Sequence, residues 1–141
     1  MKCACVLLLS LCSFLAARAQ QSDALIAGSG GGFTGMANAY KIFTDGKVYK
    51  GSGVAEIQYT QCAKIRKAKA KKLIHRATLA LKDAGEFNAP GNQYYFLTII
   101  LQEKETKVTW GAPDRPTPGA LKDLYQEVQG MAARLTYRPI P

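Results

Sequence analysis

The sequence predicts an α+β domain in which an antiparallel sheet of four to five strands packs against two helices, in the order β-β-(β)-α-β-β-α. Short runs rich in aromatic and β-branched residues are separated by turn signals, a pattern typical of strands joined as hairpins. Two longer segments, 63–84 and 118–135, carry apolar residues at helical spacing instead. Hairpins combined with helices in this order favour a single sheet on which both helices pack.

The first half of the chain predicts two or three strands. Residues 25–27 are expected to begin the first strand, and residues 39–43 to form the next one. Asp45-Gly46 predicts a hairpin turn, because glycine accepts the positive φ of a tight turn, and residues 47–50 return as the partner strand. Two glycines then interrupt the pattern, so residues 54–59 are expected to form a further strand or an extension after a bulge.

Residues 63–84 predict a long amphipathic helix, with Thr60 as its N-cap and Gly85 as its stop signal. Cys62 falls on the apolar arc of this helix, where an unreactive thiol is expected. The opposite arc is strongly basic and contains Lys64, Lys67, Lys69, Lys71, Lys72, His75 and Arg76. Such a patch attracts anionic partners, although a run of charge on an amphipathic helix is most often simply solvated.

The second half of the chain predicts a hairpin followed by another helix. Residues 94–101 are dominated by aromatic and β-branched side chains, which favour a strand. Residues 103–105 predict a polar turn, and residues 107–110 return antiparallel. After a proline-containing loop, Pro118 suits the first turn of a second helix that Thr117 would cap.

The beginning of the chain predicts a secretory signal peptide that spans residues 1–19. Lys2 precedes a short apolar stretch, and Ala17-Arg18-Ala19 supplies small residues for cleavage after Ala19. The apolar stretch is shorter than the roughly 20 residues of a membrane-spanning helix. We therefore expect an exported protein, secreted or periplasmic, whose contact with the membrane is through this peptide before cleavage. Residues 20–28 are then expected to be a loose segment, and residues 29–141 a single α+β domain.

The mature chain offers little catalytic or metal-binding chemistry. Three of the four cysteines leave with the signal peptide, so Cys62 has no partner for an internal disulfide. Zinc sites need three or four protein ligands, usually Cys or His, and only Cys62 and His75 remain. His75 is the one histidine available as a base, and no Gly-x-Ser-x-Gly motif accompanies it. We therefore expect no catalytic residues, no metal, no cofactor and no enzymatic activity.

Two further features could serve as ligand sites. The glycine-rich segment 28–35 leads into a strand, not a helix, so it lacks the context of a phosphate-binding loop. It is either a flexible or bulged lead-in to the sheet, or a binding edge whose backbone glycine leaves exposed. Tyr94, Tyr95 and Trp110 could form an aromatic platform, but alternation along strands places at least half of them in the core.

Two sets of motifs resemble known families. Gly31-Gly32-Phe33-x-Gly35, followed by a strand, a helix, the aromatic strand Tyr94-Tyr95-Phe96-x-Thr98-Ile99 and a final helix, resembles the emfourin family, small bacterial protein inhibitors of thermolysin-like metallopeptidases. The chain departs from that pattern in its signal peptide, in an extra glycine and in an insertion at 51–58. Phe87-Asn88-x-Pro90-Gly91-Asn92-x-Tyr94-Tyr95-Phe96 and Thr109-Trp110-Gly111 are similar to motifs of exported Bacteroidetes-type proteins whose function is uncharacterised.

The first resemblance implies a non-enzymatic binding protein that inhibits an extracellular or periplasmic metallopeptidase. Loops anchored by strands would occlude the protease cleft, with Phe33 either as an apolar anchor or packed on the core. The expected partner-binding residues are Gly31, Gly32, Phe33, Gly35, Asn88, Pro90, Gly91 and Asn92. An alternative stays open in which the chain is a structural or envelope-associated protein whose basic helix binds an anionic surface. Export argues against nucleic acid as a partner.

Overall fold

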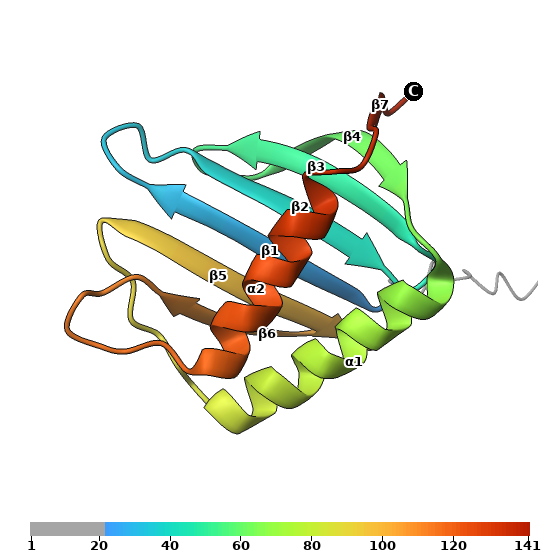
Figure 1. Ribbon diagram of the computed structural model, residues 1–141. Helices are drawn as coiled ribbons and strands as arrows, with labels where there is room; N and C mark the ends of the chain where they lie inside the picture. The colour runs from blue at the N-terminus through green and yellow to red at the C-terminus, as the bar shows by residue number, and fades with distance from the viewer. Residues whose placement is uncertain (1–21) are drawn as a thin grey trace, which may run out of the picture.

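The computed structural model describes residues 22–141, so the expected signal peptide lies outside the described residues. The elements are, in chain order, β1 (Ala24–Gly31), β2 (Ala37–Phe43), β3 (Lys47–Gly53), β4 (Gln58–Lys64), α1 (Lys67–Ala84), β5 (Gln93–Leu101), β6 (Lys104–Trp110), α2 (Gly119–Ala132) and β7 (Arg138–Pro139). The strands form one sheet in the order β6-β5-β1-β2-β3-β4-β7, and all neighbours are antiparallel (Figure 1). This confirms the α+β class, while the sheet has seven strands instead of four to five.

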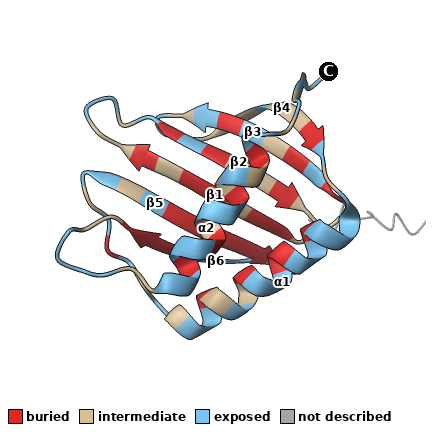
Figure 2. Cartoon of the chain, in the orientation of Figure 1, coloured by how far each residue is buried: buried red, intermediate tan, exposed pale blue. Residues whose placement is uncertain are grey.

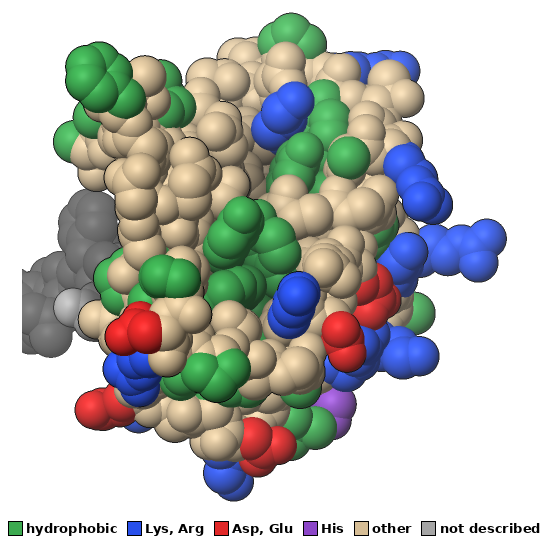
Figure 3. Space-filling model, turned by 60° about the vertical axis from the view of Figure 1, so that its left-hand side comes forward, with side chains coloured by type: hydrophobic (Ala, Val, Ile, Leu, Met, Phe, Trp, Pro, Cys, Tyr) green, Lys and Arg blue, Asp and Glu red, His purple; other side chains and the backbone are tan. Residues whose placement is uncertain are grey.

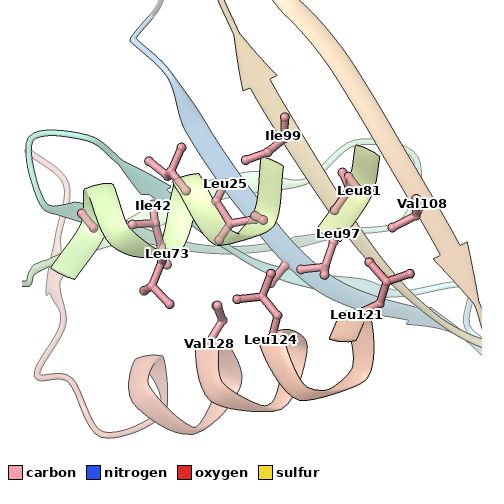
Figure 4. Close-up of a cluster of buried hydrophobic side chains, with 14 of the residues drawn as sticks. Leu25, Ile42, Leu73, Leu81, Leu97, Ile99, Val108, Leu121, Leu124 and Val128 are labelled. Carbon is pink, nitrogen blue, oxygen red and sulfur yellow. The ribbon is translucent and has the colours of Figure 1, made fainter. Parts of the chain in front are cut away.

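Both helices cover the same face of the sheet, which gives the domain two layers (Figure 1). Buried residues follow the central strands and the sheet-facing sides of the helices (Figure 2). In Figure 4, leucine, isoleucine and valine side chains from the sheet and both helices point toward one another and form the core. The largest fully buried side chains are Leu25, Ile42, Val48, Leu73, Leu81, Leu97, Val108, Leu121, Leu124 and Val128. This core lies within residues 24–132.

Residues 58–64 form β4, whereas the sequence pattern placed a helix from residue 63 onward. Cys62 pairs in register with Tyr49 of β3, so the short apolar stretch around it belongs to a strand. α1 begins only at Lys67, and its N-cap is Arg66, not Thr60. The helix ends at Gly85, as the sequence predicts.

The glycine-rich segment also differs from expectation, because β1 runs from Ala24 through Gly31. Much of the segment 20–28, which was expected to be loose, therefore belongs to the centre of the sheet. Gly28 pairs in register with Phe96 of β5. A Cβ atom at Gly28 would overlap the Phe96 ring, and one at Gly30 would lie 2.6 Å from the hydroxyl oxygen of Tyr94. Glycine at these positions lets two aromatic side chains lie over the strand.

These aromatic side chains belong to the sheet face that is turned away from the helices. On this face, the Lys107 ammonium lies 4.7 Å from the centroid of the Phe96 ring, and the Lys41 ammonium 5.9 Å from that of Tyr59. Burial raises the pKa of Tyr59 to about 12, and the Glu105 carboxylate adds to the shift. Lysine side chains thus lie over aromatic rings on the face that no helix covers.

Candidate functional site

The glycine loop after β1 is fixed to the segment that precedes β5. Gly31, Gly32 and Gly35 have φ values of 101°, 73° and 63°, which side-chain-bearing residues rarely adopt. Within this turn the Gly35 N–H donates to the Gly32 carbonyl at 3.3 Å, and the Gly32 N–H donates to the Asn92 carbonyl at 2.8 Å. The structure thus brings together the two segments that the sequence had suggested separately as partner-binding loops.

An apolar tip, made of Phe33, Met36 and Val54, projects from this end of the sheet. Phe33 is fully exposed, and Met36 and Val54 are 41% and 66% exposed. Val54 comes from the turn between β3 and β4, and its Cγ1 lies 3.8 Å from where a Cβ of Gly35 would be. Phe33 therefore does not pack on the core. Figure 3, which turns this end of the molecule forward, shows several hydrophobic side chains at the surface.

The segment 88–92 is held by backbone hydrogen bonds on its other side. Asn88 forms a parallel bridge with Thr109 of β6, and the Ala89 N–H donates to the Thr109 carbonyl at 2.8 Å. Pro90 is exposed, and a Cβ atom at Gly91 would overlap the carbonyl of Gly111. The expected residues of this segment thus connect the glycine loop to the start of the β6–α2 loop.

An aromatic groove of about 640 Å³ opens beside this segment, between β5, β6, the following loop and α2. Tyr95, Trp110 and Tyr125 line it, with the Trp110 and Tyr125 rings edge to face at 5.4 Å and the Tyr95 and Trp110 rings stacked at 6.1 Å. Arg115 and Lys122 also line the groove, and within the described chain no carboxylate does. Burial raises the pKa of the Tyr125 hydroxyl above its ordinary value. A hydrogen bond with the Ser29 side chain lowers that pKa and so offsets part of the effect of burial. The groove offers aromatic surface and positive charge.

Only part of this aromatic cluster could be recognised in the sequence. Tyr95 and Trp110, two residues of the predicted platform, do meet because they pair in register across β5 and β6. Tyr94 lies on the opposite face of the sheet beside Phe96, so it is not part of the groove. The platform predicted from the sequence lacks Tyr125, which lies half-buried at the groove and packs against the core, with its ring touching both other aromatics.

The expected basic patch lies at the other end of the sheet. Lys64 ends β4, and Lys67, Lys69, Lys71, Lys72 and Arg76 belong to the first three turns of α1. All six side chains are exposed, as is His75. The patch joins the turn between β2 and β3, since the Ile65 N–H donates to the Gly46 carbonyl at 2.9 Å. Figure 3 shows Lys and Arg side chains clustered along one side of the molecule.

Residues 22–141 contain no group of three or more His, Cys, Asp or Glu side chains that could hold a metal ion. Over the same range, no helix is long and apolar enough to cross a membrane. Cys62 is a free thiol, half-buried on β4, with its sulfur 3.6 Å from the Ala63 carbonyl oxygen. The exposed loops suit contact with another protein, and the aromatic groove suits the binding of a ligand.

No family model matches the sequence, and comparison with curated proteins found no match.

Proposed function

We propose that this chain is an exported, non-enzymatic protein-binding domain that engages its partner through the loop end of the sheet. The loop end consists of the glycine loop 31–36, the turn 54–57, and the segments 88–92 and 111–117. The observation that carries the proposal is the complete exposure of Phe33 on a loop whose backbone is fixed. A fully exposed phenylalanine ring contributes no apolar burial to the stability of the fold. A partner pocket that buries the ring would stabilise the complex.

The backbone geometry favours tight binding because little freedom is lost when the partner arrives. Gly31 still pairs with Gln93 in the sheet, Ala37 begins β2, and Gly32 is bonded to Asn92 between them. The loop therefore has five residues between two fixed points, 32–36. Pre-organisation of this kind raises affinity mainly by lowering the entropy lost on association.

The partner that the motif Gly31-Gly32-Phe33-x-Gly35 suggests is a thermolysin-like metallopeptidase in the same compartment. Inhibition by this route needs no catalytic group on the inhibitor. The loop end occludes the protease cleft, and Phe33 enters an apolar side-chain pocket there. Segment 88–92 supports the loop from behind and widens the contact.

The test is a titration of a thermolysin-like metallopeptidase with the purified protein starting at residue 20, which retains the whole described core. We expect loss of peptidase activity at stoichiometric concentrations. The Phe33→Ala variant should inhibit about thirtyfold more weakly or worse, as for a residue that anchors an interface. Leu79→Ala, which also truncates a half-exposed apolar side chain but on α1, should inhibit as the wild type does. Unchanged proteolysis at micromolar excess, or equal inhibition by all three proteins, would contradict the proposal.

A further inference from the structure

The basic end of the domain carries more positive charge than the fold neutralises. We define it by eight exposed residues of β3, β4 and α1 and the link between the last two: Lys47, Lys64, Arg66, Lys67, Lys69, Lys71, Lys72 and Arg76. In the described chain, ion pairs reach two of them, Lys47 with Asp45 at 3.4 Å and Arg76 with Glu127 at 2.5 Å. Six cations at this end have no ion-pair partner in residues 22–141.

The unpaired positive charge lies beside the N-terminus of α1, where it destabilises the isolated domain. A helix N-terminus carries partial positive charge and is stabilised by acidic side chains or by a capping oxygen. Here the first turn has no acidic residue, and the N-cap Arg66 makes no side-chain capping bond. Basic residues stand in those places instead. Residues that disfavour the local structure are expected where a sequence serves binding. A bound anion would neutralise the basic side chains at this helix N-terminus and so remove the repulsion.

The composition of the patch points to a diffuse array of phosphates. Six of the eight residues are lysines, which act as flexible point charges, while arginine is the residue suited to bidentate recognition. Between residues 60 and 86, which include seven of the eight, there is no Phe, Trp or Tyr, so the α1 side of this surface lacks the stacking rings on which single-stranded nucleic acid binds. A bilayer surface with anionic headgroups requires neither fixed geometry nor stacking.

We propose that the basic end docks the domain on an anionic phospholipid bilayer. Docking there leaves the loop end free, because the two lie at opposite ends of the same strands. The β2–β3 turn and the start of α1 meet at one end, and the glycine loop lies at the other, beyond the eight residues of β1 (Figure 1). At about 3.3 Å per residue, that strand separates them by roughly 25 Å. The docked domain presents Phe33 away from the membrane, toward a partner.

The test measures co-sedimentation of the protein starting at residue 20 with vesicles of phosphatidylcholine, with and without phosphatidylglycerol. We expect binding only to the anionic vesicles, and loss of binding as salt is raised. The triple variant Lys67→Gln, Lys71→Gln, Lys72→Gln should bind more weakly by about fivefold for each lysine removed. Circular dichroism checks that the variants stay folded.

The matched control removes three exposed basic side chains far from the basic end, as Lys82→Gln, Arg115→Gln, Lys122→Gln. Its net charge equals that of the first variant, but we expect binding to fall by less than about fivefold in total, since charges beyond about 10 Å from the bilayer are screened. Equal loss in both variants would overturn the proposal, as would absence of binding at low salt. Tighter binding to a mixed-sequence DNA oligonucleotide than to anionic vesicles would also overturn it.

Discussion

The backbone N–H of Gly32 donates a hydrogen bond to the carbonyl oxygen of Asn92, 2.8 Å away. The two residues belong to loops that are far apart in the sequence, one after β1 and one before β5. Their bond extends the pairing of Gly31 with Gln93 beyond the sheet, so the two loops behave as a single surface. We therefore expect a partner that binds one loop to contact the other as well.

This contact predicts the effect of Gly31→Ala. A Cβ atom there would overlap the Asn92 carbonyl, and the φ of 101° disfavours any side chain. We expect the free energy of unfolding to fall by about 1–3 kcal/mol, and partner binding to weaken with it. The matched control is Gly119→Ala, because a Cβ atom built at Gly119 has no neighbouring atom within 4 Å. There the free energy of unfolding should change by about 0.5 kcal/mol at most. Urea unfolding measures both variants. Equal stability in the two would show that the loops do not meet as described.

A second pair of glycine substitutions tests the aromatic layer on the helix-free face. Gly28→Ala would press a methyl group against the Phe96 ring and the Asn38 carbonyl oxygen, and should destabilise the domain by about 1–3 kcal/mol. Gly130→Ala, on the exposed side of α2 with open space around it, should stabilise it by about 0.5–1 kcal/mol through helix propensity. Thermal unfolding reports opposite shifts in Tm. A stabilising Gly28→Ala would mean that Phe96 does not lie over the strand.

Tyr59 predicts a loss of stability at alkaline pH. Burial, with a smaller contribution from Glu105, raises its pKa from 10.0 to about 12 in the folded state. The unfolded chain ionises first, so this contribution to stability is complete below pH 10 and is lost as the pH rises toward 12. In Tyr59→Phe we expect a shallower decline of the unfolding free energy over that interval. Burial also raises the pKa values of Tyr125 and Tyr137, so part of the alkaline loss of stability should remain in this variant. An unchanged slope would contradict the burial of the Tyr59 hydroxyl.

Trp110 is the single tryptophan of the chain and reports on the groove. It is 5% exposed, so its fluorescence should be blue-shifted and poorly accessible to a soluble quencher. Because the basic end lies at the far side of the domain, anionic vesicles should leave this emission unchanged. Tyr95→Ala removes the stacked neighbour and should make Trp110 easier to quench. Strong quenching of the wild type would contradict the packed aromatic cluster.

Local patterns in the sequence were sufficient for the elements that local interactions determine. The Asp45-Gly46 turn is confirmed, with Gly46 at a φ of 90°. The stop of α1 at Gly85 and the pairing of β5 with β6 are confirmed as well. In each case, the residues that specify the structure are close together in the chain.

The misassigned elements depend on partners that are distant in the sequence. Gly28 and Gly30 look like breakers until Phe96 and Tyr94 of β5 are placed over them. β4 resembles the start of a helix because the apolar pair Cys62 and Ala63 fits either spacing, and its pairing with β3 decides the outcome. The groove likewise required α2 to be packed on the sheet before Tyr125 could meet Trp110.

The central claim is that the loop end is the binding surface, and hydrogen–deuterium exchange of the domain with a thermolysin-like metallopeptidase tests it most directly. We predict protection on complex formation in peptides covering residues 31–36 and 88–92, with unchanged exchange in residues 67–76 of the basic end. Protection confined to α1, or none at saturating peptidase, would contradict the claim.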